Sequence, residues 1–116
     1  MLRVIQLLLD SGANLDRRDK DGNTTLSLAC IANNTEAMEM LLDAGSDTEV
    51  RNHNGCPPLA LASINHHPEA VKILLEALAD PESRNNLGDT PLSMASLHFA
   101  GNTNVMKVLL DAGTTL

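Results

Sequence analysis

The sequence predicts an all-α solenoid, in which helix–turn–helix units stack side by side and short β-hairpin loops join them. The first observation is a segment that recurs every 33 residues, beginning at Gly22, Gly55 and Gly88. The second is that Leu and Ala keep the same places in each copy. These residues are Leu26, Leu59, Leu92, Ala29, Ala62 and Ala95. Self-similarity at a fixed period of this length is typical of repeat arrays.

The period divides the 116 residues of this single domain into four segments. We expect a partial repeat at 1–18 and full repeats at 19–51, 52–84 and 85–116. The last repeat contains a two-residue insertion near residues 97–100, at the turn between its two helices. Loops are where repeat arrays accept insertions.

Each repeat is predicted to end in a helix with a broad apolar face, and the chain opens inside such a pattern at residues 1–10. The residues expected to be buried in the later copies are Met38, Leu41, Leu42, Val71, Leu74, Leu75, Val105, Val108, Leu109 and Leu110. Gly45 and Gly113 follow two of these helices, where glycine suits the left-handed conformation. Leu78 stands at the same position in the middle copy. We therefore expect either a different helix end there or a strain of about 1–2 kcal/mol.

Polar segments rich in turn formers follow the apolar helices, and we expect them to form extended hairpin-like loops and no core sheet. Short helices should come next, at about 25–32, 58–65 and 91–98. Thr24 and Thr90 are placed as N-caps, because a hydroxyl oxygen can accept from the first free backbone N–H groups. Pro57 occupies the cap position of the middle short helix, which should lack a side-chain cap.

The composition excludes several classes of protein. A net charge of −7 disfavours general binding to nucleic acid or to an anionic membrane surface, and the apolar runs are too short to span a bilayer. Cys30 and Cys56 form neither a disulfide framework nor a metal-binding spacing. His53 and His66-His67 belong to opposite edges of a repeat. We therefore expect no catalytic residue, no cofactor and no metal.

The pattern resembles the ankyrin repeat. The segment Thr90-Pro91-Leu92-Ser93-Met94-Ala95 is the nearest match to the Thr-Pro-Leu-His-x-Ala core of that family. Residues 101–110 resemble the family's second helix, and residues 12–16 resemble the exit from that helix into the hairpin. The resemblance implies an ankyrin-repeat solenoid of three full repeats preceded by the second helix of another.

This sequence departs from the family at two positions of each repeat. The family's His, which ties neighbouring repeats, is replaced by Ser27, Ala60 and Ser93. Its loss implies an array weakened by about 1 kcal/mol for each missing hydrogen bond. Asp16, Glu49 and Glu82 stand where some family members carry a hydroxylated Asn, so we do not expect that modification in its usual form. The array also shows no polar capping repeat, which indicates a fragment of a longer array.

The resemblance implies a non-catalytic module that binds a partner protein through its hairpin tips and short helices. The candidate partner-binding residues are Arg18, Lys20, Asp21, Asn23, Arg51, His53, Asn54, Cys56, Arg84, Asn86, Leu87, Asp89 and Phe99. On the short helices, Ile31, Ile64 and Leu97 share one register position.

Two of these candidates have alternative interpretations. The arginine column could clamp carboxylates of an acidic partner, or each arginine could pair with a nearby carboxylate such as Asp19 or Asp21. Phe99, the only aromatic residue, could anchor a partner or fold back over Leu97 and the final helix.

Three functional classes fit these features: an interaction scaffold within a larger ankyrin-repeat protein, a free-standing inhibitor of an enzyme or transcription factor, and a regulatory segment of a larger enzyme or channel. We expect a protein that is monomeric or part of a longer chain, located in the cytoplasm with the nucleus as the alternative. The partner's identity does not follow from the sequence.

Overall fold

The computed structural model describes residues 2–10, 14–97 and 103–114. Within these ranges it contains seven helices and no strand. The helices are α1 (Leu2–Asp10), α2 (Thr25–Ile31), α3 (Thr35–Asp43), α4 (Pro58–Ile64), α5 (Pro68–Glu76), α6 (Pro91–Leu97) and α7 (Asn104–Asp111). Phe99 and most of the predicted two-residue insertion lie outside the described residues.

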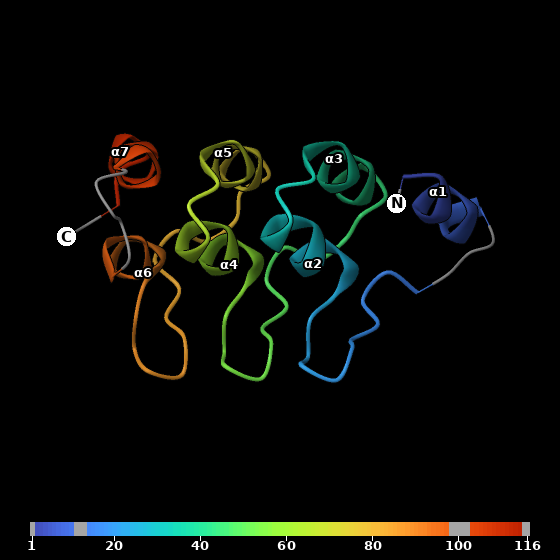
Figure 1. Ribbon diagram of the computed structural model, residues 1–116, viewed down its shortest axis with the longest axis horizontal. Helices are drawn as coiled ribbons and strands as arrows, with labels where there is room; N and C mark the ends of the chain where they lie inside the picture. The colour runs from blue at the N-terminus through green and yellow to red at the C-terminus, as the bar shows by residue number, and fades with distance from the viewer. Residues whose placement is uncertain (1, 11–13, 98–102, 115–116) are drawn as a thin grey trace.

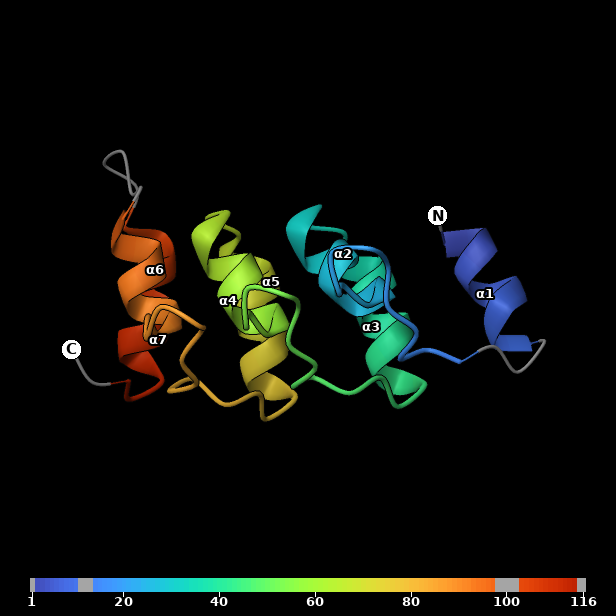
Figure 2. The same ribbon diagram turned by 90° about the horizontal axis from the view of Figure 1, so that it is seen from below.

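The helices form two parallel rows (Figures 1 and 2). The short helices α2, α4 and α6 pack on one another in order along one row, and α1, α3, α5 and α7 do the same along the other. Hairpin loops project from the side of the short helices, as Figure 1 shows. The result is an elongated molecule of 43 × 24 × 23 Å, which confirms the predicted solenoid.

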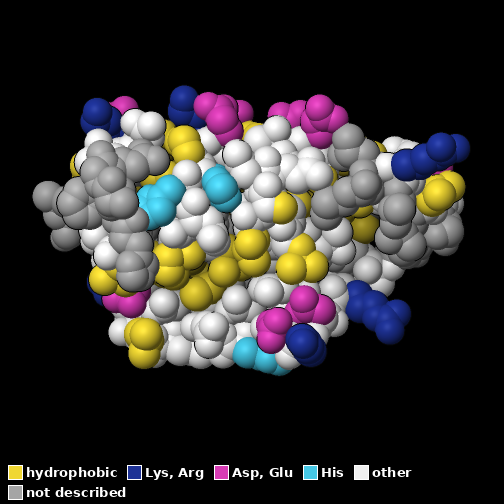
Figure 3. Space-filling view, viewed as in Figure 1, with side chains coloured by type: hydrophobic (Ala, Val, Ile, Leu, Met, Phe, Trp, Pro, Cys, Tyr) yellow, Lys and Arg dark blue, Asp and Glu magenta, His cyan; other side chains and the backbone are white. Residues whose placement is uncertain are grey.

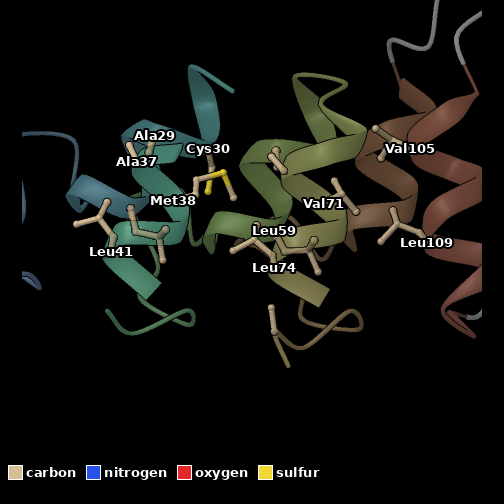
Figure 4. Close-up of a cluster of buried hydrophobic side chains, with 14 of the residues drawn as sticks. Ala29, Cys30, Ala37, Met38, Leu41, Leu59, Val71, Leu74, Val105 and Leu109 are labelled. Atoms are coloured by element: carbon tan, nitrogen blue, oxygen red, sulfur yellow. The ribbon is translucent and has the colours of Figure 1, made fainter. Parts of the chain in front are cut away.

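The core lies between the two rows (Figure 4). Leu26 and Leu59 from the short helices meet Met38, Leu41 and Leu74 from the long ones, and all five are buried. Three alanines at the repeat period are fully buried beside them: Ala29, Ala62 and Ala95. Because alanine has only a methyl side chain, the helices can approach closely at these points.

The starts of the short helices agree with the predictions. Thr24 Oγ1 accepts a hydrogen bond from the Ser27 N–H at 3.2 Å, and Thr90 Oγ1 accepts one from the Ser93 N–H at 3.2 Å. The middle helix α4 follows Pro57 and has no side-chain cap. Each short helix ends one residue earlier than the sequence indicated.

Leu78 decides between the two alternatives for the end of α5. It adopts the left-handed conformation with φ of 66°, as Gly45 and Gly113 do with φ of 91° and 88°. The helix therefore ends in the same way as its neighbours, and Leu78 carries the strain. Its side chain is exposed, so packing does not compensate for that strain.

The prediction that Leu110 is buried is wrong, because this side chain is 40% exposed. The equivalent residues Leu42 and Leu75 are half-buried, since another long helix packs beside each of them. Helix α7 is the last of its row in the described chain, and no neighbour covers the side that carries Leu110.

Candidate functional site

The hairpins are the part of the fold that presents the predicted binding residues. In the middle hairpin, the Gly55 N–H donates to the Asn52 carbonyl at 2.9 Å and the Asn52 N–H donates to the Cys56 carbonyl at 3.0 Å. Gly55 has φ of 77°, a conformation that glycine adopts without strain. The same two bonds close the first hairpin at Asp19 and the last at Asn85.

The side chain that begins each hairpin holds its tip in shape. Asn52 Oδ1 accepts hydrogen bonds from the backbone N–H groups of Asn54 and Cys56, both at 3.0 Å. Asp19 and Asn85 make the equivalent pairs of bonds. This column therefore fixes the direction in which the neighbouring candidate residues point.

Backbone hydrogen bonds also join each hairpin to the next. The His53 N–H donates to the Asp21 carbonyl and the Asn86 N–H donates to the Asn54 carbonyl, both at 3.0 Å. The Asn86 side chain adds a bond from Nδ2 to the His53 carbonyl at 3.0 Å. The three tips are thus held in register as one continuous edge.

Two of the candidate binding residues, Asn23 and Cys56, are buried between hairpins, and this is a correction to their predicted exposure. Asn52 Nδ2 donates to Asn23 Oδ1 at 3.1 Å, and Asn85 Nδ2 makes the equivalent, weaker contact with Cys56 Sγ at 3.9 Å. Burial raises the pKa of the Cys56 thiol, although the Asn85 contact opposes this shift. These two positions belong to the packing between repeats.

The arginine column takes an arrangement that neither interpretation anticipated. Arg51 Nη1 donates to the Gly55 carbonyl at 3.0 Å and also to the Arg84 carbonyl, and Arg84 Nη1 donates to the Gly88 carbonyl at 2.7 Å. The arginines thus bond the backbone of the hairpins. Arg18, Arg51 and Arg84 all remain exposed. Because a guanidinium has five N–H donors, each keeps donors for a partner.

The other candidates lie along the exposed edge. Lys20, Asp21, His53, Asn54, Asn86 and Leu87 are exposed, and Asp89 is half-buried. Leu87 is the most unusual of them, because it is apolar and 86% exposed. We call these seven residues together with Arg18, Arg51 and Arg84 the hairpin edge.

An apolar stripe runs beside the hairpin edge on the short helices. Ile31 and Ile64 are half-buried and Leu97 is exposed, all at the last residue of a short helix. Figure 3 shows hydrophobic side chains gathered in a band between the hairpins and the acidic long helices. Sequence reasoning missed Leu28, which is exposed on α2 and could have been found from its 33-residue register with Leu61 and Met94.

Within the described ranges, no three His, Cys, Asp or Glu side chains gather as they would around a metal ion. The helices in those ranges are also too short or too polar to cross a membrane.

The comparison with protein families gives a single match. The family model described as "Ankyrin repeats (3 copies)" matches residues 1–85 and 44–116. The chain belongs to the ankyrin-repeat family. Ankyrin repeats are generally protein–protein interaction modules and are typically non-catalytic. No curated protein matches this chain.

Proposed function

We propose that this ankyrin-repeat chain binds a partner protein, without catalysis, through the hairpin edge and the apolar stripe. The observation that supports this most is that the same positions are exposed in register in successive repeats. The arginines of the hairpin edge recur every 33 residues, and bonds such as that from the His53 N–H to the Asp21 carbonyl align the tips. A surface whose backbone is already ordered loses little entropy when a partner binds.

The distribution of charge supports a partner of a particular kind. The chain has a net charge of −7, yet five of its eight Lys and Arg residues lie in the hairpin loops. These five are Arg17, Arg18, Lys20, Arg51 and Arg84. The long helices carry exposed carboxylates on the opposite side, among them Glu36, Glu39, Asp43, Glu69 and Glu76. A partner segment with carboxylates for the hairpin edge and aliphatic side chains for the stripe would complement both features.

The test is partner capture with a variant that changes only the hairpin edge. Charge reversal at Arg51 is unsuitable, because this residue also bonds two backbone carbonyls. Lys20→Glu combined with Leu87→Ser is better, since both side chains are exposed tip residues. The matched control is Lys72→Glu on the long helix α5.

We expect the double variant to lose the proteins that the immobilised wild-type chain captures, and titration of the purified partner to give at least tenfold weaker binding. The Lys72→Glu control should bind as the wild type does. Retained binding by the double variant, with loss in the control, would place the interaction on the long helices and refute the proposal.

A further inference from the structure

A hollow of about 400 Å³ lies beside α2 at the end of the row of short helices. Its lining includes Arg17, Arg18, Asp19, Asn23, Thr25 and Leu28. Figure 1 shows α4 on one flank of α2 and no short helix on the other, beneath α1. The hollow thus lies where a further member of the row would pack.

The later repeats show what covers this face of a short helix. Leu61 on α4 and Met94 on α6 occupy the position of Leu28, and they are only 8% and 3% exposed. They lie in a buried cluster against which Ile31 and Ile64 pack, from the last turns of α2 and α4. Leu28 is 39% exposed. The face is therefore shaped to receive an aliphatic side chain from the last turn of a short helix.

The charged groups around the hollow are mainly cationic. Arg17 and Arg18 are both exposed, and the hollow also contains the carboxylate of Asp19. One oxygen of Asp19 accepts hydrogen bonds from the backbone N–H groups of Asp21 and Asn23. Two guanidiniums and one engaged carboxylate make this a positive site on a chain of net charge −7. Such a site favours an occupant with a carboxylate.

The position of α1 limits the size of the occupant. Helix α1 already packs on α3 in the row of long helices. A complete repeat in the hollow would bring its own long helix into the place of α1. The last repeat of a second copy is excluded in the same way, because its α7 would overlap α1. Only a short helix without a long-helix companion fits.

We propose that this hollow is a docking site for one short helix of a partner protein. That helix carries an aliphatic side chain on its last turn and a carboxylate that faces Arg17 and Arg18. The site lies at the end of the stack, goes beyond the proposed function and shares only Arg18 with the hairpin edge.

The probe is a synthetic peptide with the sequence of residues 88–97, which has Asp89 near its start and Leu97 at its end. A side-chain lactam on its solvent face keeps it helical, because a helix of this length is marginal on its own in water. The peptide is titrated into the full ¹⁵N-labelled chain, and the backbone amide resonances are followed by NMR.

We expect saturable shifts centred on Asn23, Thr25 and Leu28. Leu28→Ala should weaken peptide binding about tenfold, because it removes most of the apolar contact. Arg17→Gln should weaken it about threefold, and this loss should shrink as salt is added. The matched control is Leu110→Ala on α7, since Leu110 is 40% exposed and far along the stack. It should leave the affinity unchanged.

The absence of saturable shifts around α2 would overturn the proposal, and so would equal affinity of the Leu28→Ala variant and the wild type. Sedimentation of the chain alone tests the second copy as an occupant. A dimer that Leu28→Ala abolishes would show that a copy of this chain fills the hollow, and it would overturn the assignment to a partner helix. Should Leu28→Ala fail to fold, Arg17→Gln and its salt dependence provide the test.

Discussion

His67 Nε2 lies 3.0 Å from the carbonyl oxygen of Ile31, so the turn before α5 is tied to the end of α2 in the preceding repeat. The family's histidine, which usually ties repeats together, is absent from this chain. Ser27 and Ser93 stand in its place, and they bond Thr24 and Thr90 of their own repeats. The bond from His67 is therefore a connection between repeats made from a different position.

We predict that His67→Ala lowers the free energy of unfolding by about 1 kcal/mol, the usual net worth of one hydrogen bond. The loss should come from the contact with Ile31 alone, because His67 makes no side-chain bond that caps α5. Urea unfolding followed by circular dichroism measures it. Lys72→Ala, an exposed change on α5, serves as the control. Equal stability of the two variants would show that the bond contributes nothing.

Leu78→Gly should stabilise the chain by about 1 kcal/mol. Leu78 is held at φ of 66° with an exposed side chain, and glycine adopts this conformation without the steric penalty. The midpoint of urea unfolding should rise while its slope stays constant. An unchanged or lower midpoint would mean that the Leu78 side chain makes a compensating contact in solution.

The reciprocal change, Gly45→Ala, should destabilise the chain by about 1 kcal/mol. Gly45 has φ of 91°, and an added Cβ would meet no atom within 4 Å. The cost should therefore come from backbone strain and not from a clash. Thermal unfolding of this variant beside Leu78→Gly gives the two signs in one experiment, and shifts in the same direction would contradict the argument.

The parts of the fold that sequence predicted are those set by neighbouring residues. Thr24 and Thr90 cap their helices because a hydroxyl at that position needs only the next turn of backbone. The left-handed helix ends at Gly45 and Gly113 are local in the same sense. The 33-residue period then assembles these local units into the solenoid without further information.

The parts of the site that sequence did not predict depend on contacts between repeats. Asn23 and Cys56 read as exposed hairpin residues, and they are buried because Asn52 and Asn85 of the following hairpins cover them. The hydrogen bond from Arg51 to the Arg84 carbonyl likewise joins residues 33 positions apart. Such contacts follow from the spacing of the hairpins, which a single sequence does not give.

Asn52→Ala should lower the free energy of unfolding by about 2 kcal/mol. The substitution removes three hydrogen bonds at once, two from backbone N–H groups of its own hairpin and one to Asn23 Oδ1. Of the groups left behind, the Cys56 N–H and Asn23 Oδ1 belong to buried residues, where an unpaired polar group is costly. Differential scanning calorimetry measures the loss.

Asn54→Ala is the matched control for Asn52→Ala, because Asn54 is an exposed residue of the same hairpin tip. Its effect on stability should stay within about 0.5 kcal/mol. If both variants lost the same stability, the side chain of Asn52 would not be what holds the tip in shape.

The Cys30 thiol should resist modification in the folded chain. Burial raises its pKa from the ordinary value near 9 to about 12, so almost none of it is thiolate at pH 8. The native state therefore keeps a proton that the unfolded chain releases near pH 9. This contribution to stability is complete below pH 9 and is lost as the pH rises from 9 toward 12. We expect Cys30 to react with a thiol reagent at pH 8 only as fast as the chain unfolds, and urea midpoints to fall above pH 9. Rapid modification of Cys30 in the folded chain, with peptide mapping to identify the residue, would contradict its burial.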